Sequence, residues 1–109
     1  METNRAVDAL GALAQASRLQ VYRLLVQKGP EGVAAGELAE RLNVPANTLS
    51  FHLKALSHAG LVQTRQDGRF VYYSANYGQM NALLGFLTEN CCGGRSCQPS
   101  VAPRKRRVS

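Results

Sequence analysis

The chain has 109 residues, a formal net charge of +6 and three cysteines. This length fits one domain, and no apolar run approaches the roughly 20 residues of a membrane-spanning helix. The N-terminus also lacks the pattern of a secretory signal, so we expect a cytoplasmic protein with reduced thiols and no membrane partner. The positive charge favours a nucleic-acid partner, but residues 1–90 carry eight basic and seven acidic side chains and are nearly neutral. A DNA-binding surface must therefore depend on where a few single charges lie.

Two helices are predicted before residue 30. Apolar residues recur at helical spacing over about 4–14 and again over about 17–28. Thr3 and Ser17 can cap these helices, because a hydroxyl oxygen accepts a hydrogen bond from a backbone N–H of the first turn. Gly29-Pro30 is expected to end the second helix.

A helix-turn-helix motif is predicted between residues 33 and 62. Helices over 35–42 and 46–58 are separated by Asn43-Val44-Pro45, whose proline has no N–H and suits a helix start. Two amphipathic helices joined by so short a turn form the motif whose second helix can enter the major groove of DNA. The buried stripe expected of that second helix consists of Leu49, Leu53 and Leu56.

Two strands and a tight turn follow the motif directly. Residues 61–66 and 70–74 are rich in β-forming side chains and flank Asp67-Gly68-Arg69, in which Asp-Gly is a strong hairpin signal. A hairpin in this place, after a recognition helix, is a wing. Arg65 and Arg69 are expected near its tip, where they can reach backbone phosphates.

A last helix is predicted over about 77–89, with Asn76 as its cap. Its apolar stripe and that of the first helix have little left to cover in so small a domain, so we expect both to form a homodimer face. The predicted fold is mainly α with a β-hairpin wing: a homodimeric winged helix-turn-helix of order α-α-α-α-β-β-α over residues 1–90. A cysteine-containing segment, 91–97, and a basic tail, 98–109, follow, and we expect the tail to be disordered on its own.

The outer arc of the helix over 46–58 carries the candidate DNA-reading residues. Small and amide side chains at a helix start suit base-edge readout, since Asn can pair with adenine and a methyl group can touch thymine. Basic side chains and one histidine are candidates for phosphate contacts, which set the register on DNA. The candidates are Ala46, Asn47, Thr48, Ser50 and Phe51 for bases, and His52, Lys54, Arg65 and Arg69 for phosphates. The simpler alternatives are a solvated helix face and, for His52, a place at the edge of the core.

All three cysteines, Cys91, Cys92 and Cys97, lie within seven residues. In a cytoplasmic protein such a cluster suggests soft-metal or redox chemistry. Gly93-Gly94 permits a bend that would bring the thiols to one ion. Three thiolates without a nearby His or Asp favour a three-coordinate guest over zinc, which normally takes four ligands. Trivalent arsenic or antimony, As(III) or Sb(III), fits best; a disulfide-based redox switch and incidental thiols are the alternatives.

The chain to about residue 90 resembles the ArsR-type (ArsR/SmtB) family of bacterial metal- and metalloid-responsive repressors. The resemblance lies in motifs that occur in the family's order and at its intervals. They are Leu10-Gly11-Ala12-Leu13-Ala14 with Arg18-Leu19, Gly36-Glu37-Leu38-Ala39, the stretch from Leu49 to Leu56, Ala59-Gly60-Leu61-Val62, and the stretch from Arg69 to Tyr73. The resemblance implies a winged-helix homodimer that blocks a promoter until an inducer binds.

Family members place their inducer sites differently, and two of these sites are missing here. One site has cysteines before the recognition helix, where this chain has Ala34-Ala35-Gly36-Glu37-Leu38. Another has Asp and His along the last helix, and residues 77–89 contain neither. The cluster of three cysteines instead looks like the C-terminal arsenite site of some members.

The sequence therefore predicts a repressor of an arsenic-resistance operon, bound to double-stranded operator DNA as a homodimer. As(III) or Sb(III) would release it by binding Cys91, Cys92 and Cys97, from one subunit or from two. No acid–base partner accompanies the thiols, so we expect no enzymatic activity. The alternatives are a thiol redox-responsive repressor and a sensor of trivalent organoarsenicals, a sensor type that needs only two thiols.

Overall fold

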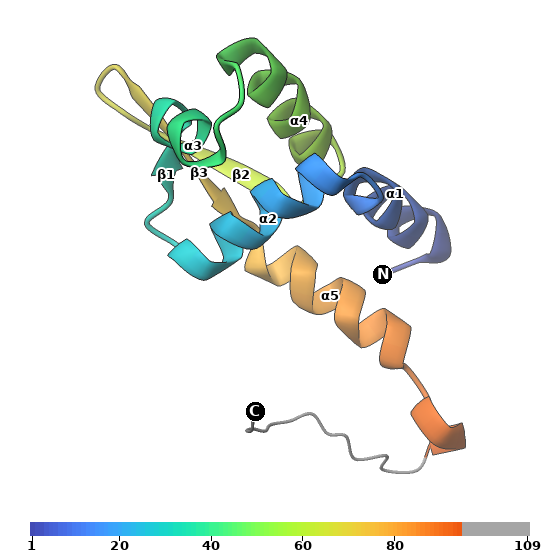
Figure 1. The fold of residues 1–109 in the computed structure, drawn as a ribbon. Helices are drawn as coiled ribbons and strands as arrows, with labels where there is room; N and C mark the ends of the chain where they lie inside the picture. The colour runs from blue at the N-terminus through green and yellow to red at the C-terminus, as the bar shows by residue number, and fades with distance from the viewer. Residues whose placement is uncertain (95–109) are drawn as a thin grey trace, which may run out of the picture.

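The computed structural model describes residues 1–94, and its helices and strands follow the predicted order (Figure 1). They are α1 (Thr3–Leu13), α2 (Ala16–Lys28), β1 (Val33–Ala34), α3 (Ala35–Leu42), α4 (Ala46–His58), β2 (Val62–Asp67), β3 (Phe70–Ala75) and α5 (Tyr77–Thr88), with a 3-10 turn at Cys91–Gly94. The prediction of a mainly helical fold with a β-hairpin wing is confirmed. Cys97 and the predicted tail, 98–109, lie outside the described residues.

The helix starts differ from the sequence prediction at two caps. Thr3 is the first residue of α1, and Glu2 precedes it without a side-chain cap. The cap of α2 is Gln15, whose side-chain oxygen accepts a hydrogen bond from the backbone N–H of Arg18 at 2.9 Å. Ser17 is therefore inside the helix, and its prediction as a cap was wrong. At α5 the predicted cap is confirmed, since Asn76 Oδ1 accepts from the backbone N–H of Gln79.

The core lies where α2, α3 and α4 meet the start of the sheet. The predicted stripe of α4 is buried, in one core cluster with Val21, Leu25, Leu38 and Leu61. Helix α1 buries only alanines on this core, which lets its backbone approach closely, and it leaves Val7 and Leu10 exposed. Those two apolar side chains lie on the outer face of α1, where the sequence predicts a homodimer face.

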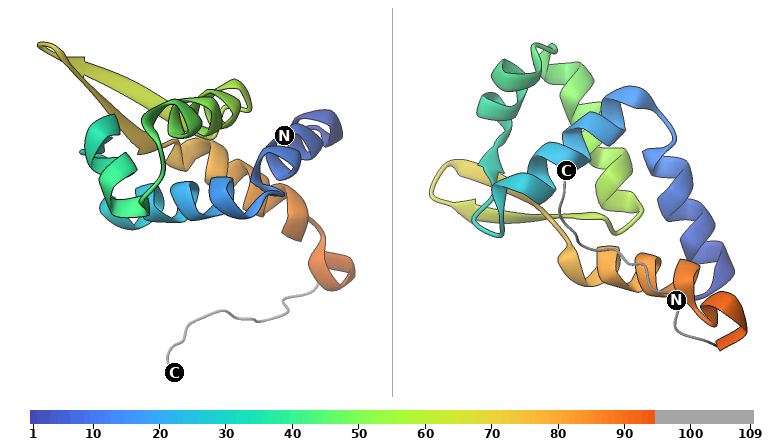
Figure 2. Two further views of the ribbon diagram at one scale, coloured as in Figure 1. Left: turned by 45° about the horizontal axis from the view of Figure 1, so that its top comes forward. Right: turned by 60° about the horizontal axis from the view of Figure 1, so that its bottom comes forward.

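A three-stranded antiparallel sheet of order β1-β3-β2 replaces the simple hairpin that the sequence predicted. The additional strand, β1, has only two residues and pairs Val33 with Tyr73 of β3. Gly32 permits this pairing, because its φ is +82° and a Cβ atom there would lie 2.8 Å from the carbonyl oxygen of Tyr73. In the hairpin, Asp67 pairs with Phe70 and Gly68, at φ +65°, makes the turn. The hairpin projects beyond the helices, on the side of the molecule where α4 lies (Figure 2).

Helix α5 leaves the sheet and extends away from the helix-turn-helix, and the 3-10 turn with Cys91 and Cys92 sits at its far end (Figure 1). Leu84 and Leu87 are exposed on this helix. In the single chain, α1 and α5 thus both present apolar side chains outward, as the predicted homodimer face requires. Within residues 1–94, no helix has both the length and the apolar character needed to cross a membrane.

Candidate functional site

The start of α4 presents the residues that the sequence assigned to base contacts. Pro45 precedes the helix in an extended conformation, and Ala46, Asn47 and Thr48 form an exposed first turn. Asn47 Oδ1 accepts a hydrogen bond from the backbone N–H of Thr48 at 2.9 Å, which leaves its amide nitrogen available as a donor. The short turn before α4 ends α3 with Asn43 in a left-handed conformation at φ 54°. Asn43 and Pro45 thus fix the path of the chain between α3 and α4, and with it the direction in which the first turn of α4 faces.

The middle of α4 carries three more of the predicted contacts on the same outer arc. Ser50, Phe51 and Lys54 are exposed, and Phe51 is 63% exposed despite being apolar. An exposed aromatic ring on a recognition helix can touch a thymine methyl group, and the ammonium of Lys54 can pair with a phosphate. These residues are therefore accessible for the base and phosphate contacts that the sequence predicts.

The structure corrects the placement of His52, which is 6% exposed and faces the core. Its Nδ1 accepts a hydrogen bond from Nε of Arg18 on α2, with 3.2 Å between the two nitrogens. In this structure His52 is therefore not placed to contact a phosphate, and its predicted phosphate contact stays a prediction. His52 is instead a histidine at the edge of the core, the alternative that the sequence left open.

Sequence reasoning missed the role of Arg18. Its guanidinium carbon lies 5.3 Å from the ring centroid of Phe51, in addition to the hydrogen bond with His52. Arg18 therefore joins α2 to both a buried and an exposed residue of the recognition helix. The pattern in α2 gave no signal for this, because the contact joins residues 34 positions apart in the chain.

The two wing arginines differ. Arg69 lies in the hairpin turn and is exposed, as predicted. Arg65 points back from the tip: it donates to the carbonyl oxygen of Glu31 at 2.9 Å, and its guanidinium carbon lies 4.6 Å from the ring centroid of Tyr72. A further ion pair with Asp67 spans 3.7 Å. Arg65, two residues before the end of β2, thus fastens the wing to the loop before β1, whereas Arg69 lies in the turn itself.

The cysteine segment follows α5 after one residue beyond its cap. Asn90, Cys92 and Gly93 have positive φ values of 56°, 57° and 66°. The chain therefore bends sharply between residues 90 and 93, which includes the first glycine of the predicted Gly93-Gly94 bend. The Sγ atoms of Cys91 and Cys92 lie 3.7 Å apart. Cys92 is disulfide-bonded in this structure, so it would have to be reduced before both sulfur atoms could bind one soft ion.

A complete metal-binding set is not contained in the described residues. Residues 1–94 hold no group of three or more His, Cys, Asp or Glu side chains placed to bind an ion together. Cys97, the third predicted ligand, lies outside that range, so the structure brings together two of the three predicted ligands.

Comparison with known proteins identifies the architecture. Residues 13–65 match a family model described as a helix-turn-helix domain. The HTH-type transcriptional regulator YceK of Bacillus subtilis is 40% identical over 77 residues, which cover 70% of this chain and 76% of that protein. The arsenical resistance operon repressor of the same organism is 37% identical over 81 residues, covering 74% of this chain and 73% of that protein. This chain belongs to the ArsR family of transcriptional regulators.

Solved structures of ArsR-type proteins share its fold. The structure of HlyU from Vibrio cholerae, a transcriptional activator, has a TM-score of 0.65 at 34% identity and covers 84% of this chain and 99% of its own. A homodimeric winged helix-turn-helix DNA-binding domain from Mycobacterium bovis, a possible ArsR-family regulator, has a TM-score of 0.63 at 26% identity and covers 88% of this chain and 89% of its own. Helices α3 and α4 are thus the helix-turn-helix of a DNA-binding regulator, and β2–β3 is its wing.

Proposed function

We propose that this ArsR-family protein is a homodimeric repressor of an arsenic-resistance operon that leaves its operator when As(III) or Sb(III) binds Cys91, Cys92 and Cys97. The observation that carries the proposal is the gathering of Cys91 and Cys92 at the end of α5, where their sulfur atoms lie 3.7 Å apart; the disulfide of Cys92 must be reduced before an ion can bind. The similarity to an arsenical resistance operon repressor supports it.

The chemistry of the thiols favours a trivalent metalloid. Arsenous acid exchanges its three hydroxyl groups for three thiolate sulfurs, so three As–S bonds form and three water molecules leave with the three thiol protons. From three reduced thiols this exchange needs no oxidant or reductant; the disulfide of Cys92 must first be reduced by a thiol reductant such as glutathione. Thiolates are soft ligands, and hard cations such as Mg²⁺ and Ca²⁺ prefer oxygen ligands. The left-handed conformation of Cys92, rare for a residue with a Cβ atom, is a local strain of the kind found at ligand sites.

The position of the segment suggests how binding would affect DNA. Cys91 lies just beyond α5, whose Leu84 and Leu87 are exposed and suited to a dimer interface. A homodimeric relative supports an assembly of this kind. Ordering the segment on a bound ion would change how α5 meets its partner, and with it the distance between the two recognition helices. That distance must match successive major grooves, about 34–36 Å apart.

The first experiment measures arsenite binding and DNA binding on the same samples. A DNA duplex selected by the protein from a random pool serves as the operator, with affinity read by fluorescence anisotropy. We expect arsenite to weaken DNA binding by about 5- to 150-fold, and DNA to weaken arsenite binding by the same factor. Equal arsenite affinity with and without the duplex would refute the mechanism.

Cysteine variants distinguish the ligand set. Cys97→Ser should abolish the response to arsenite while DNA affinity without arsenite stays unchanged; Ser57→Ala, on the exposed side of α4's last turns, is a control for a neutral hydroxyl change. X-ray absorption should count three sulfur neighbours per arsenic in the wild type.

A second candidate is a sensor of trivalent organoarsenicals, favoured by the close pair of Cys91 and Cys92. Under this alternative, phenylarsine oxide, whose arsenic gives up its oxygen as water and forms two As–S bonds, should release Cys97→Ser from DNA. A wild-type response to arsenite in Cys97→Ser would also favour the two-thiol site.

A further inference from the structure

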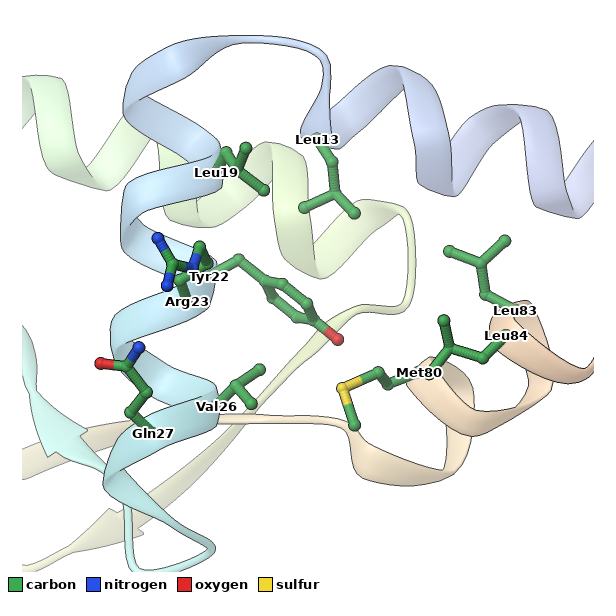
Figure 3. A pocket seen from close by; sticks show the side chains of 9 residues that line it. All are labelled: Leu13, Leu19, Tyr22, Arg23, Val26, Gln27, Met80, Leu83 and Leu84. Carbon is green, nitrogen blue, oxygen red and sulfur yellow. The ribbon is translucent and has the colours of Figure 1, made fainter. Parts of the chain in front are cut away.

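An apolar cavity of about 310 Å³ lies between α2 and α5, away from both the recognition helix and the cysteines (Figure 3). Its walls are aliphatic and thioether side chains from the end of α1, from α2 and from α5. They include Leu13, Leu19, Val26, Met80, Leu83 and Leu84. Arg23 and Gln27 lie at its edge and are exposed, so water screens the charge at this rim.

One buried polar group faces this cavity. The ring of Tyr22 extends from α2 toward α5, with its hydroxyl between the two helices (Figure 3). Tyr22 is 6% exposed, and its hydroxyl has no hydrogen-bond partner in the described part of the chain. The neighbouring Tyr77 differs, because its hydroxyl donates to the carbonyl oxygen of Val26 at 2.8 Å. A buried hydroxyl without a partner is costly, so the environment of Tyr22 is incomplete.

Burial and the neighbouring Tyr77 raise the pKa of Tyr22 above its ordinary value of 10.0. The phenol therefore keeps its proton at neutral pH and can donate it in a hydrogen bond. A partner within the cavity needs an acceptor such as a carbonyl or ether oxygen. The rest of the lining offers apolar contact, which excludes a strongly charged occupant because charge is costly to bury without a pair.

We infer that this cavity is a second effector site, which binds a small, uncharged and mainly apolar molecule whose hydrogen-bond acceptor faces the hydroxyl of Tyr22. Small-molecule sites have volumes of about 300–1,000 Å³, apolar walls and a few placed polar groups. An apolar cavity of about 150 Å³ holds one benzene, so this volume suits about two fused rings. The site goes beyond the proposed arsenic response, since it uses none of the cysteines.

The walls of the cavity give such a molecule a route to the DNA-binding surface. Helix α2 forms one wall and also carries Arg18, which contacts the recognition helix. Helix α5 forms the other wall and continues to the cysteine segment. A molecule held between them contacts both helices and changes the freedom of one to move against the other.

Two probes of matched shape test the inference on the full-length protein. 2-Acetylnaphthalene carries a carbonyl acceptor, and 2-ethylnaphthalene has nearly the same shape without it. The chain has only two methionines, Met1 and Met80. Met80 lines the cavity and Met1 does not, so ¹³C-methyl NMR follows the site and an internal control together.

We expect saturable shifts of the Met80 methyl and none of Met1, with the ketone bound about 2- to 12-fold more tightly than the hydrocarbon, as one net hydrogen bond gives. Tyr22→Phe should remove this preference while both probes still bind. Cys91→Ser should bind both probes as the wild type does, which separates this site from the arsenic site.

Three results would overturn the inference. One is the absence of a saturable Met80 shift with either probe. Another is equal affinity for the two probes in the wild type, a comparison that stands even if Tyr22→Phe fails to fold. The third is a Met80 shift that depends on protein concentration and not on probe, since a second copy of the chain would then fill the cavity.

Discussion

Replacing His52 by leucine tests whether the histidine of the recognition helix reads DNA or holds the helix in place. Leucine has a similar volume and suits a buried position, so the main loss is the acceptor for Nε of Arg18. A hydrogen bond with a charged partner contributes about 1.5–3 kcal/mol to stability. The distance of 3.2 Å is at the long end of the range, and Arg18 is only half-buried and can regain water. We therefore expect His52→Leu to lower the free energy of unfolding by about 1–2 kcal/mol.

Two measurements distinguish the roles. Urea denaturation at one fixed protein concentration gives the free energy of unfolding. In a thermal melt, a loss of about 1 kcal/mol would lower Tm by about 4–8 °C for a domain of this size. The salt dependence of DNA binding gives the number of phosphate contacts, since each contributes about 0.9 to the slope of log affinity against log salt. We expect lower stability and an unchanged slope. The exposed His58 provides a matched control, and His58→Leu should leave stability nearly unchanged.

The reverse outcome would refute this reasoning. If His52→Leu kept its stability and lost about one phosphate contact from the slope, the imidazole would have to reach DNA in the complex. A double-mutant cycle with Arg18→Ala adds a second check. The two changes should be non-additive, because both remove the same hydrogen bond. His52→Gln should recover part of the stability, since its side-chain oxygen can accept from Arg18.

The remaining predictions concern the wing, the sheet and the cavity. Arg69→Ala should lower DNA affinity and reduce the salt slope by about 0.9, as measured by anisotropy at several salt concentrations; an unchanged slope would remove Arg69 from the interface. Gly32→Ala should lower the free energy of unfolding by roughly 2 kcal/mol or more, because the new Cβ atom meets both an unfavourable positive φ and a close carbonyl oxygen. Gly68→Ala, which has a positive φ but open space around it, should cost about 1 kcal/mol, and urea denaturation measures both. Because burial raises the pKa of Tyr22, the folded state keeps a proton above pH 10.0 that the unfolded state loses, so the free energy of unfolding should fall as pH rises beyond that value. Tyr22→Phe should fall less steeply; an equal fall would assign the effect to other groups.

The sequence was sufficient for the elements that depend on local periodicity. Helices α3 and α4 were predicted with the bounds that the structure shows, because Pro45 and the leucine stripe of α4 mark them clearly. Strand β1 was missed because two residues carry no periodic signal, and its pairing with β3 depends on Gly32 and on residues some 40 positions later. The cap of α2 was missed for a related reason: a glutamine is a less common cap than the serine two residues later.

The candidate site also has features that follow from local periodicity and features that do not. Exposure of Phe51 and Lys54 follows from the helical period once the buried leucines are known. The burial of His52 and the inward turn of Arg65 do not, since each depends on a partner from a distant segment, Arg18 on α2 and the carbonyl of Glu31. Residue type favours phosphate contacts for both, and the tertiary structure shows that each also has a partner within the chain.

Helix α2 contacts both the recognition helix and α5 in the described structure. Arg18, at its start, holds His52 of the recognition helix, while the carbonyl of Val26, near its end, accepts a hydrogen bond from Tyr77 at the start of α5. A change at α5, from thiols bound to arsenic or from a molecule in the cavity, would therefore reach α4 through one rigid helix of 13 residues. Rigid helices transmit displacement with little loss, but coupling requires that both ends have two arrangements. Tyr77→Phe removes the hydrogen bond between α5 and α2 and so tests this route. DNA binding without inducer should persist. If α2 carries the coupling, the factor by which arsenite and DNA weaken each other's binding should shrink toward one.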